Sequence, residues 1–371
     1  MPEPPRASSR TSSAPGQIVG LVALAWVPLW ALALPAWVRT GQVDPLLVDA
    51  EVHARLLVAL TVLLVAGEAL EQRIALVLRS VADDGVLPDD GPMTDWLVAG
   101  HRLRAPALVK LLGAAWVAAV YTVPLLAYQR VMPTSTFRWL ASTVDGPELS
   151  GSGAWWWYVL VGQPLLLLAA GRWLLRWWLW SVSMWRVARR RPRIHAAHAD
   201  EAGGLGFLRL PLMGLRGFVF AVGITIAAVW FDEIGAGLAQ TSTFAADFVA
   251  FLFAVLVLQY GPYVGFSSAL IDARERGAVE YATLARRYLA QFDARWLHDP
   301  RSSAALLGNP DMSALADLSA SVAVVGRMRT SIPTLGDLEA TLIVAAIPFV
   351  VVALAYGPST VELIQTALHL I

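Results

Sequence analysis

The chain has 371 residues, of which 57% are hydrophobic and 15% are charged, and it contains no cysteine. A soluble domain of this length carries about 25% charged residues, so a large part of this surface must face lipid. The 28 basic and 28 acidic residues balance, which argues against a nucleic-acid partner. The missing cysteines exclude disulfides, thiolate metal sites and thiol catalysis. The composition therefore predicts a multi-pass membrane protein whose main partner is the lipid bilayer.

Residues 1–16 are rich in Pro, Ser and Arg and are expected to form a disordered cytosolic tail. After this tail, seven apolar runs reach the length of about 20 residues that a helix needs to cross the hydrocarbon core. The expected spans are 18–38, 56–78, 107–128, 155–178, 210–231, 244–270 and 338–356. We therefore expect an all-α fold with seven transmembrane helices, of which the first six occupy residues 17–270.

The basic residues predict how these helices are oriented, since Lys and Arg gather at the cytosolic ends of spans. With the N-terminus inside, 24 of the 28 basic residues fall in inner segments and the other four fall in outer segments. Such an asymmetry favours an odd number of spans, with the N-terminus in and the C-terminus out. The expected location is a bacterial inner membrane.

Two of the helices are expected to continue beyond the bilayer on the inner side. The fourth helix meets no strong breaker after Pro164 until Pro192, so it is predicted to run to about residue 191. The sixth helix passes into an amphipathic pattern within residues 271–336, where a second helix is expected to begin with Asp311 as its cap. Together these segments predict a small helical cytosolic domain.

The last part of the chain, residues 337–371, is predicted to hold the seventh span and one short helix. Gly357 and Pro358 stop the span, and Ser359 and Glu362 have the spacing of a capping box. We therefore expect a short amphipathic helix from about Thr360, lying in the outer interface or packed on a neighbouring subunit.

Tryptophan and arginine alternate near the inner end of the fourth span. This pattern is typical of the aromatic belt at a membrane–water interface and is a much better fit to that than to single-stranded nucleic acid. The predicted belt consists of Trp173, Trp177, Trp178, Trp180 and Trp185.

Three stretches resemble a family of uncharacterised bacterial multi-pass membrane proteins. They are His198-Ala-Asp-Glu-Ala-Gly-Gly-Leu-Gly-Phe-Leu208, Arg276-Gly-Ala-Val-Glu-Tyr281 and Leu306-Leu-Gly-Asn-Pro-Asp-Met-Ser-Ala-Leu-Ala-Asp-Leu318. In that family a similar His-x-Asp-x-Ala-Gly-Gly-Leu-Gly-Phe-Leu stretch precedes the fifth span. The resemblance covers residues 195–333 and implies no activity. A looser likeness, in topology alone, connects the chain to seven-span channels related to insect chemoreceptors.

Glu68 and Glu71 place carboxylates within the second span, where an ionised group is costly unless it is paired or hydrated. One interpretation is that they line an ion or proton path. The other is that they form a buried pair with Arg172 or Arg176 of the fourth span. A water-accessible Glu68 would favour the first interpretation, and a Glu68 held by an arginine would favour the second.

Tyr260, Gly261 and Pro262 lie inside the sixth span and predict a helix hinge with a free backbone carbonyl. Such a bend is used both at gates and in purely structural helices.

His195, His198 and Asp200 form a weak candidate metal site in the loop that follows the fourth helix. A capped, glycine-hinged entry into the fifth span explains the same loop without a metal, so no metal or other cofactor is expected.

The sequence holds no phosphate loop, nucleophile elbow or His-Glu-x-x-His motif, so an enzyme is not expected. An intramembrane hydrolase built from scattered residues is the minor alternative. The preferred function is an ion channel or transporter that uses an intramembrane acidic residue. The alternative is a non-transporting membrane scaffold or sensor subunit. A homo-oligomer is compatible with either function.

Overall fold

The computed structural model describes residues 15–40, 47, 49–83, 113, 115–118, 153–298 and 310–357. Within these ranges all regular elements are helical, which confirms the all-α class. Six helices there are long and apolar enough to cross a membrane, and all six match expected spans. They are Pro15–Pro35, Ala50–Val81, Tyr158–Arg189, Gly206–Gly235, Ala245–Leu297 and Leu335–Tyr356.

Some expectations fall on other parts of the chain. The third span, 107–128, lies outside the described residues except for 113 and 115–118. The N-terminal tail, apart from its last two residues, and the short helix expected from Thr360 also lie outside them.

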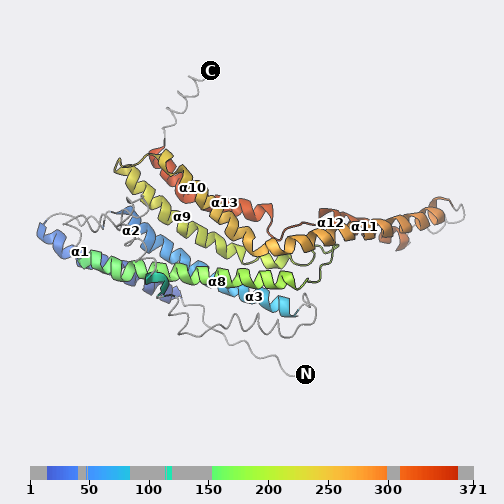
Figure 1. Cartoon of the computed structure of the whole chain (residues 1–371), viewed down its shortest axis with the longest axis horizontal. Coiled ribbons are helices and arrows are strands. Elements are labelled where there is room, and N and C mark those ends of the chain that lie inside the picture. Colours follow the sequence, from blue (N-terminus) through green and yellow to red (C-terminus); the bar gives the residue numbers. More distant parts are fainter. Residues whose placement is uncertain are drawn as a thin grey trace, which may run out of the picture.

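The membrane helices form a bundle with α9 (Leu212–Gly235) near its centre (Figure 1). It packs against α13 (Leu335–Tyr356) on one side and α3 (Leu60–Asp83) on another, while α8 (Gln163–Arg189) packs on α3. α1 (Pro15–Thr40) contacts α3 and the short α7 (Gly153–Trp157). Since α9 is apolar around most of its circumference, it can be covered by neighbours on several sides.

Three tryptophans of the predicted interfacial belt lie in the core of this bundle instead. Trp173, Trp177 and Trp180 are 0%, 3% and 1% exposed, and the Trp173 ring stacks on Phe218 of α9 at a centroid distance of 4.0 Å. Their spacing of four and three residues places them on one face of α8, which is the face turned to the bundle. The belt prediction was therefore wrong for these three. Trp178 and Trp185, on other faces, are exposed as expected.

Two helices extend well past a normal span, as predicted. α7 passes through a π-helical segment, Tyr158–Gly162, into α8, which ends at Arg189, close to the expected residue 191. α10 (Ala245–Tyr260) passes through a 3-10 segment, Gly261–Phe266, into α11 (Ser267–Phe292) and a final π-helical turn, Asp293–Leu297. The 3-10 segment begins at the predicted hinge.

α11 and α12 (Pro310–Arg327) pack on each other and project away from the bundle (Figure 1). We call residues 267–297 and 310–327 the arm, and the side of the bundle from which it leaves the arm end. α12 begins at Pro310, so Asp311 lies in its first turn and is not the predicted cap. Its carboxylate instead accepts a hydrogen bond from Trp296 Nε1 at 3.1 Å and pairs with Arg295, which ties the two helices together.

Candidate functional site

The loop between α8 and α9 is organised around the Asp200 carboxylate. It accepts backbone N–H hydrogen bonds from Ala202 at 2.9 Å, Gly204 at 3.0 Å and Gly206 at 2.7 Å. To bring three amides onto one side chain, the backbone turns through positive φ at Glu201, Gly203 and Gly204. A Cβ at Gly203 would lie 2.2 Å from the Ile194 side chain, so this position requires glycine.

The residues of the predicted metal site take part in this hydrogen-bonded loop. His198 Nδ1 lies 2.8 Å from Asp200 Oδ1, whereas His195 enters the loop through its backbone N–H, which donates to the Gly203 carbonyl. Burial acts to raise the pKa of Asp200, but the hydrogen bonds from Gly204, Ala202, Gly206 and His198 outweigh it and lower the pKa below its ordinary value. The carboxylate is thus held ionised by N–H donors, as the glycine-hinged interpretation expects.

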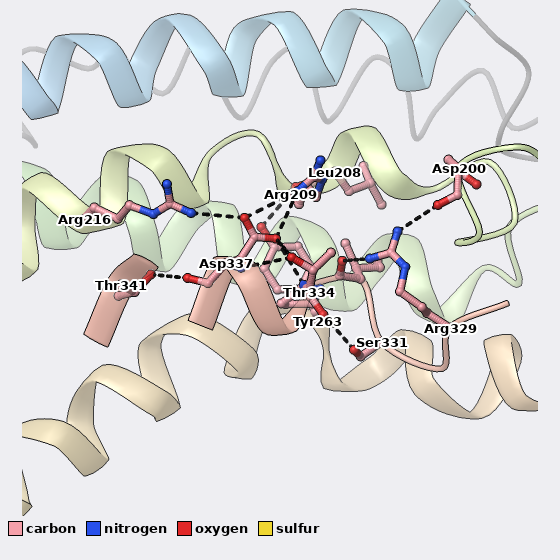
Figure 2. Close-up of polar contacts among 12 residues, drawn as sticks. Asp200, Leu208, Arg209, Arg216, Tyr263, Arg329, Ser331, Thr334, Asp337 and Thr341 are labelled. Carbon is pink, nitrogen blue, oxygen red and sulfur yellow. Dashed lines mark hydrogen bonds and ion pairs between the residues drawn. The ribbon is translucent and has the colours of Figure 1, made fainter. Parts of the chain in front are cut away.

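The end of α12 and the segment that follows it are tied to this loop by two arginines, Arg327 and Arg329. Arg329 donates from its guanidinium to the Asp200 carbonyl at 2.8 Å and from its backbone N–H to the Glu201 carbonyl at 2.7 Å. Arg327 pairs with the Glu201 carboxylate at 2.8 Å. We call Asp200, Glu201, Arg327 and Arg329 the clamp; Figure 2 shows the contact between Asp200 and Arg329. The clamp joins the base of the arm to the α8–α9 loop.

Asp337 continues this polar network into the bundle (Figure 2). It closes a capping box with Thr334 at the start of α13, and its two carboxylate oxygens also accept from Arg209 at 3.2 Å and Arg216 at 3.1 Å. Thr341 donates to the Asp337 carbonyl at 2.7 Å. One carboxylate therefore joins α9 to α13. This site was not predicted from the sequence, although the spacing of Thr334 and Asp337 is that of a helix cap.

The predicted hinge is held by indole N–H groups of α8. Pro262 has no N–H, so the Leu258 carbonyl lacks its usual partner four residues on, and Trp177 Nε1 donates to it at 3.2 Å. Trp185 Nε1 likewise donates to the Gly261 carbonyl at 2.7 Å. Next to them, the buried Tyr263 hydroxyl accepts from Trp180 Nε1 at 3.2 Å and donates to the Leu208 carbonyl at 3.0 Å. The hinge is thus fixed against both α8 and the loop.

Inside the bundle, the structure brings the four predicted charged residues together. Arg176 pairs with Glu71 and donates to the Gly67 carbonyl at 2.9 Å. Glu68 is half-buried and Arg172 is exposed, and both are near enough to interact electrostatically with Arg176. A Cβ at Gly67 would lie 3.1 Å from Arg176 Nη1, so the glycine makes room for the guanidinium. The arginine that α8 turns inward is therefore paired with a carboxylate.

The end of the bundle opposite the arm end holds a second charged cluster, which was not predicted from the sequence. Arg55 pairs with Glu51 one turn away and donates to the Tyr158 hydroxyl at 3.2 Å. Carboxylate oxygens of Asp49, Glu51 and Asp232 lie within 4.8 Å of one another, and in the described residues this is the one group with a metal-capable geometry. The spacing of Glu51 and Arg55 was a signal for the pair, but Asp232 lies on another helix.

The chain matches no family model, and it has no match among the curated proteins or the solved structures.

Proposed function

We propose that the protein is a non-transporting membrane scaffold or sensor subunit whose arm contacts a soluble partner. The observation that carries this proposal is the continuity of the arm with the membrane bundle. α10 passes into α11 through the hinge as one rod, and the clamp fastens the other helix of the arm to the α8–α9 loop. A displacement within the bundle would reach the arm by both routes.

The pairing of the intramembrane charges supports the same proposal. Arg176 already has Glu71 and the Gly67 carbonyl as partners, and Glu68 and Arg172 add one negative and one positive charge nearby, so the group is balanced. A paired arginine in the hydrocarbon region holds two helices together and does not leave an unneutralised charge for an ion to visit. Under the orientation predicted from the basic residues, the arm lies in the cytosol, where a soluble partner could reach it.

The proposal is tested by photo-crosslinking in native membranes. A photoreactive amino acid at Val279, which is 68% exposed on α11, is expected to give a defined adduct with a soluble protein. The matched control is Val249 of α10, which is 64% exposed but lies in a membrane span, and it is expected to react with lipid only. Equal products from the two positions would contradict a partner on the arm.

A channel or transporter is the second candidate, and the cluster at the opposite end of the bundle favours it. There the carboxylates of Asp49, Glu51 and Asp232 lie together, and Arg55 pairs with one of them, Glu51, so the cluster has more acidic than basic groups. Excess carboxylates in membrane helices commonly accept protons or cations that are being moved.

Flux measurements in liposomes separate the two candidates. The scaffold or sensor proposal predicts no flux of protons, potassium or chloride above that of empty liposomes. If Glu68 instead lines a path, the wild type conducts and Glu68→Gln lowers the flux without loss of folded protein, because glutamine keeps the shape and removes the charge. Such a Glu68-dependent flux would overturn the proposal.

A further inference from the structure

Three side chains between α8, α9, α10 and α13 have buried polar atoms that find no hydrogen-bond partner in the described part of the chain. They are both amide atoms of Gln259, Nε1 of Trp173 and Nε of Arg216. Gln259 and Trp173 are 0% exposed, so lipid and bulk water do not reach them. Since buried polar groups in native proteins are almost always satisfied, these atoms point to a bound species.

Contacts between the helices place Gln259 and Thr341 at the same position along the long axis of the bundle, which we call the same level. Phe251 of α10 contacts Phe349 of α13, at a centroid distance of 5.4 Å. α10 and α13 run in opposite directions, since Tyr260, farther along α10, lies near Asp337 at the start of α13. Two turns along α10 from Phe251 lead to Gln259, and two turns back along α13 from Phe349 lead to Thr341.

The other two side chains belong to the same level. Arg216 of α9 bonds to Asp337, one turn from Thr341 (Figure 2). Trp173 of α8 stacks on Phe218, two residues beyond Arg216, at 4.0 Å. The unpartnered atoms of Gln259, Trp173 and Arg216 are thus contributed by three helices over about one to two helical turns, on the order of 5–10 Å along the bundle.

The chemistry of these atoms defines the ligand. Gln259 offers two N–H donors and one acceptor, and Trp173 and Arg216 offer one N–H each, so donors outnumber acceptors four to one. At this level Arg209 and Arg216 face one carboxylate, Asp337. The neighbouring group of Arg172, Arg176, Glu68 and Glu71 has two positive and two negative charges, so one positive charge remains in excess. A species that accepts several N–H hydrogen bonds and carries negative charge satisfies both conditions.

We infer that this level of the bundle is a binding site for a small inorganic anion of the halide or nitrate class. The ligand has to be small because Gln259 and Trp173 are enclosed on all sides. It would contact α8, α9 and α10 beside the hinge and the Asp337 network. The site stands on the unpartnered buried atoms, so it does not depend on which of the two functions is correct.

Thermal unfolding of the detergent-purified full chain tests the site at constant ionic strength. The Tm is expected to rise in a saturable way when gluconate, which is too large to enter, is replaced by chloride or nitrate. Gln259→Leu is expected to abolish this response. Gln72→Leu, the same change at an exposed position of α3, is expected to keep it. A wild type with the same Tm in all three salts would mean that buried water alone fills the site and would overturn the inference.

A second variant covers the case in which Gln259→Leu fails to fold. Trp173→Phe keeps a smaller aromatic ring against Phe218 and removes the N–H donor, so it is expected to weaken chloride binding about tenfold. An unchanged chloride affinity in Trp173→Phe, or an undiminished anion response in a folded Gln259→Leu, would show that the anion binds elsewhere and would overturn the site.

Discussion

Single residues fix the hinge of the sixth span. Pro262 withholds one backbone N–H, and the Trp177 indole replaces it at the Leu258 carbonyl. The replacement comes from another helix, so it fastens α8 to α10 at the point where α10 changes its helical form.

Trp177→Phe tests this replacement. The variant keeps an aromatic ring in the core and leaves the Leu258 carbonyl without its donor, so it is expected to lower the free energy of unfolding by about 1 to 3 kcal/mol. The neighbouring Trp178 is 61% exposed, and Trp178→Phe is expected to change the free energy of unfolding by less than about 0.5 kcal/mol. The measurement is reversible unfolding in detergent, and equal losses in the two variants would refute the role given to Trp177.

Asp200 gives a prediction for the pH dependence of stability. Its pKa is lowered in the folded state, so its contribution is fully present above the pKa of the unfolded chain, about 3.9, and is lost as the pH falls through the folded value. Asp200→Asn is therefore expected to lower the Tm most at neutral pH. Its difference from the wild type should shrink below about pH 4. A difference that stays constant down to low pH would show that the charge of Asp200 does not matter.

At the scale of elements, the 3-10 segment sets how far the arm stands from the bundle. A 3-10 helix rises about 2.0 Å per residue and an α-helix about 1.5 Å, so the six residues of Gly261–Phe266 add about 3 Å to the rod. Pro262→Ala restores the missing N–H and permits a regular α-helix through the hinge.

The rod is therefore expected to shorten by about 3 Å in Pro262→Ala. Spin labels at Val249 and Glu280 and pulsed electron paramagnetic resonance measure this distance. Val264→Ala, at a position 63% exposed within the same segment, should leave it unchanged. The same distance in Pro262→Ala and the wild type would mean that packing against α8, and not proline, holds the 3-10 form.

The positions of the elements followed from the sequence where they depended on local chemistry. Runs of apolar residues located the six described spans, and Pro262 located the change in helical form. The role of Trp173 could not be read in the same way, because an indole suits both an interface and a core. Only its position on the α8 face that meets α9 decides between the two.

At the scale of the molecule, the polar sites depend on pairs far apart in the chain. Asp337 and Arg216 are separated by 121 residues, and Arg327 and Glu201 by 126. Periodicity within one helix predicts which face is polar but does not predict the residue that the face will meet. The sequence therefore identified Glu71 and Arg176 as candidates, because a charged residue within an apolar span can be recognised without knowledge of its partner. It did not identify the Asp337 network or the cluster of Asp49, Glu51 and Asp232.

The predicted orientation is open to a direct test because the chain has no cysteine. A single cysteine at Glu280, on the arm, is expected to react with a membrane-impermeant maleimide only after the membrane is opened. A single cysteine at Leu238, which is 61% exposed between α9 and α10, is expected to react in intact cells. This difference in labelling follows from the orientation that the distribution of basic residues predicts. The opposite labelling pattern would invert the topology, and labelling of both positions in intact cells would end the seven-span assignment.

The shape of the arm turns it into a lever. Ser267–Phe292 and Asp293–Leu297 form a helical rod of 31 residues, which is about 45 Å long. Its fulcrum is the hinge, where the Trp177 and Trp185 indoles donate hydrogen bonds to backbone carbonyls. A tilt of about 10° at that point would sweep the far end through about 8 Å, for a rod of this length. A rearrangement small enough to preserve the packing of the bundle would therefore become a displacement of nearly a helix diameter at the tip.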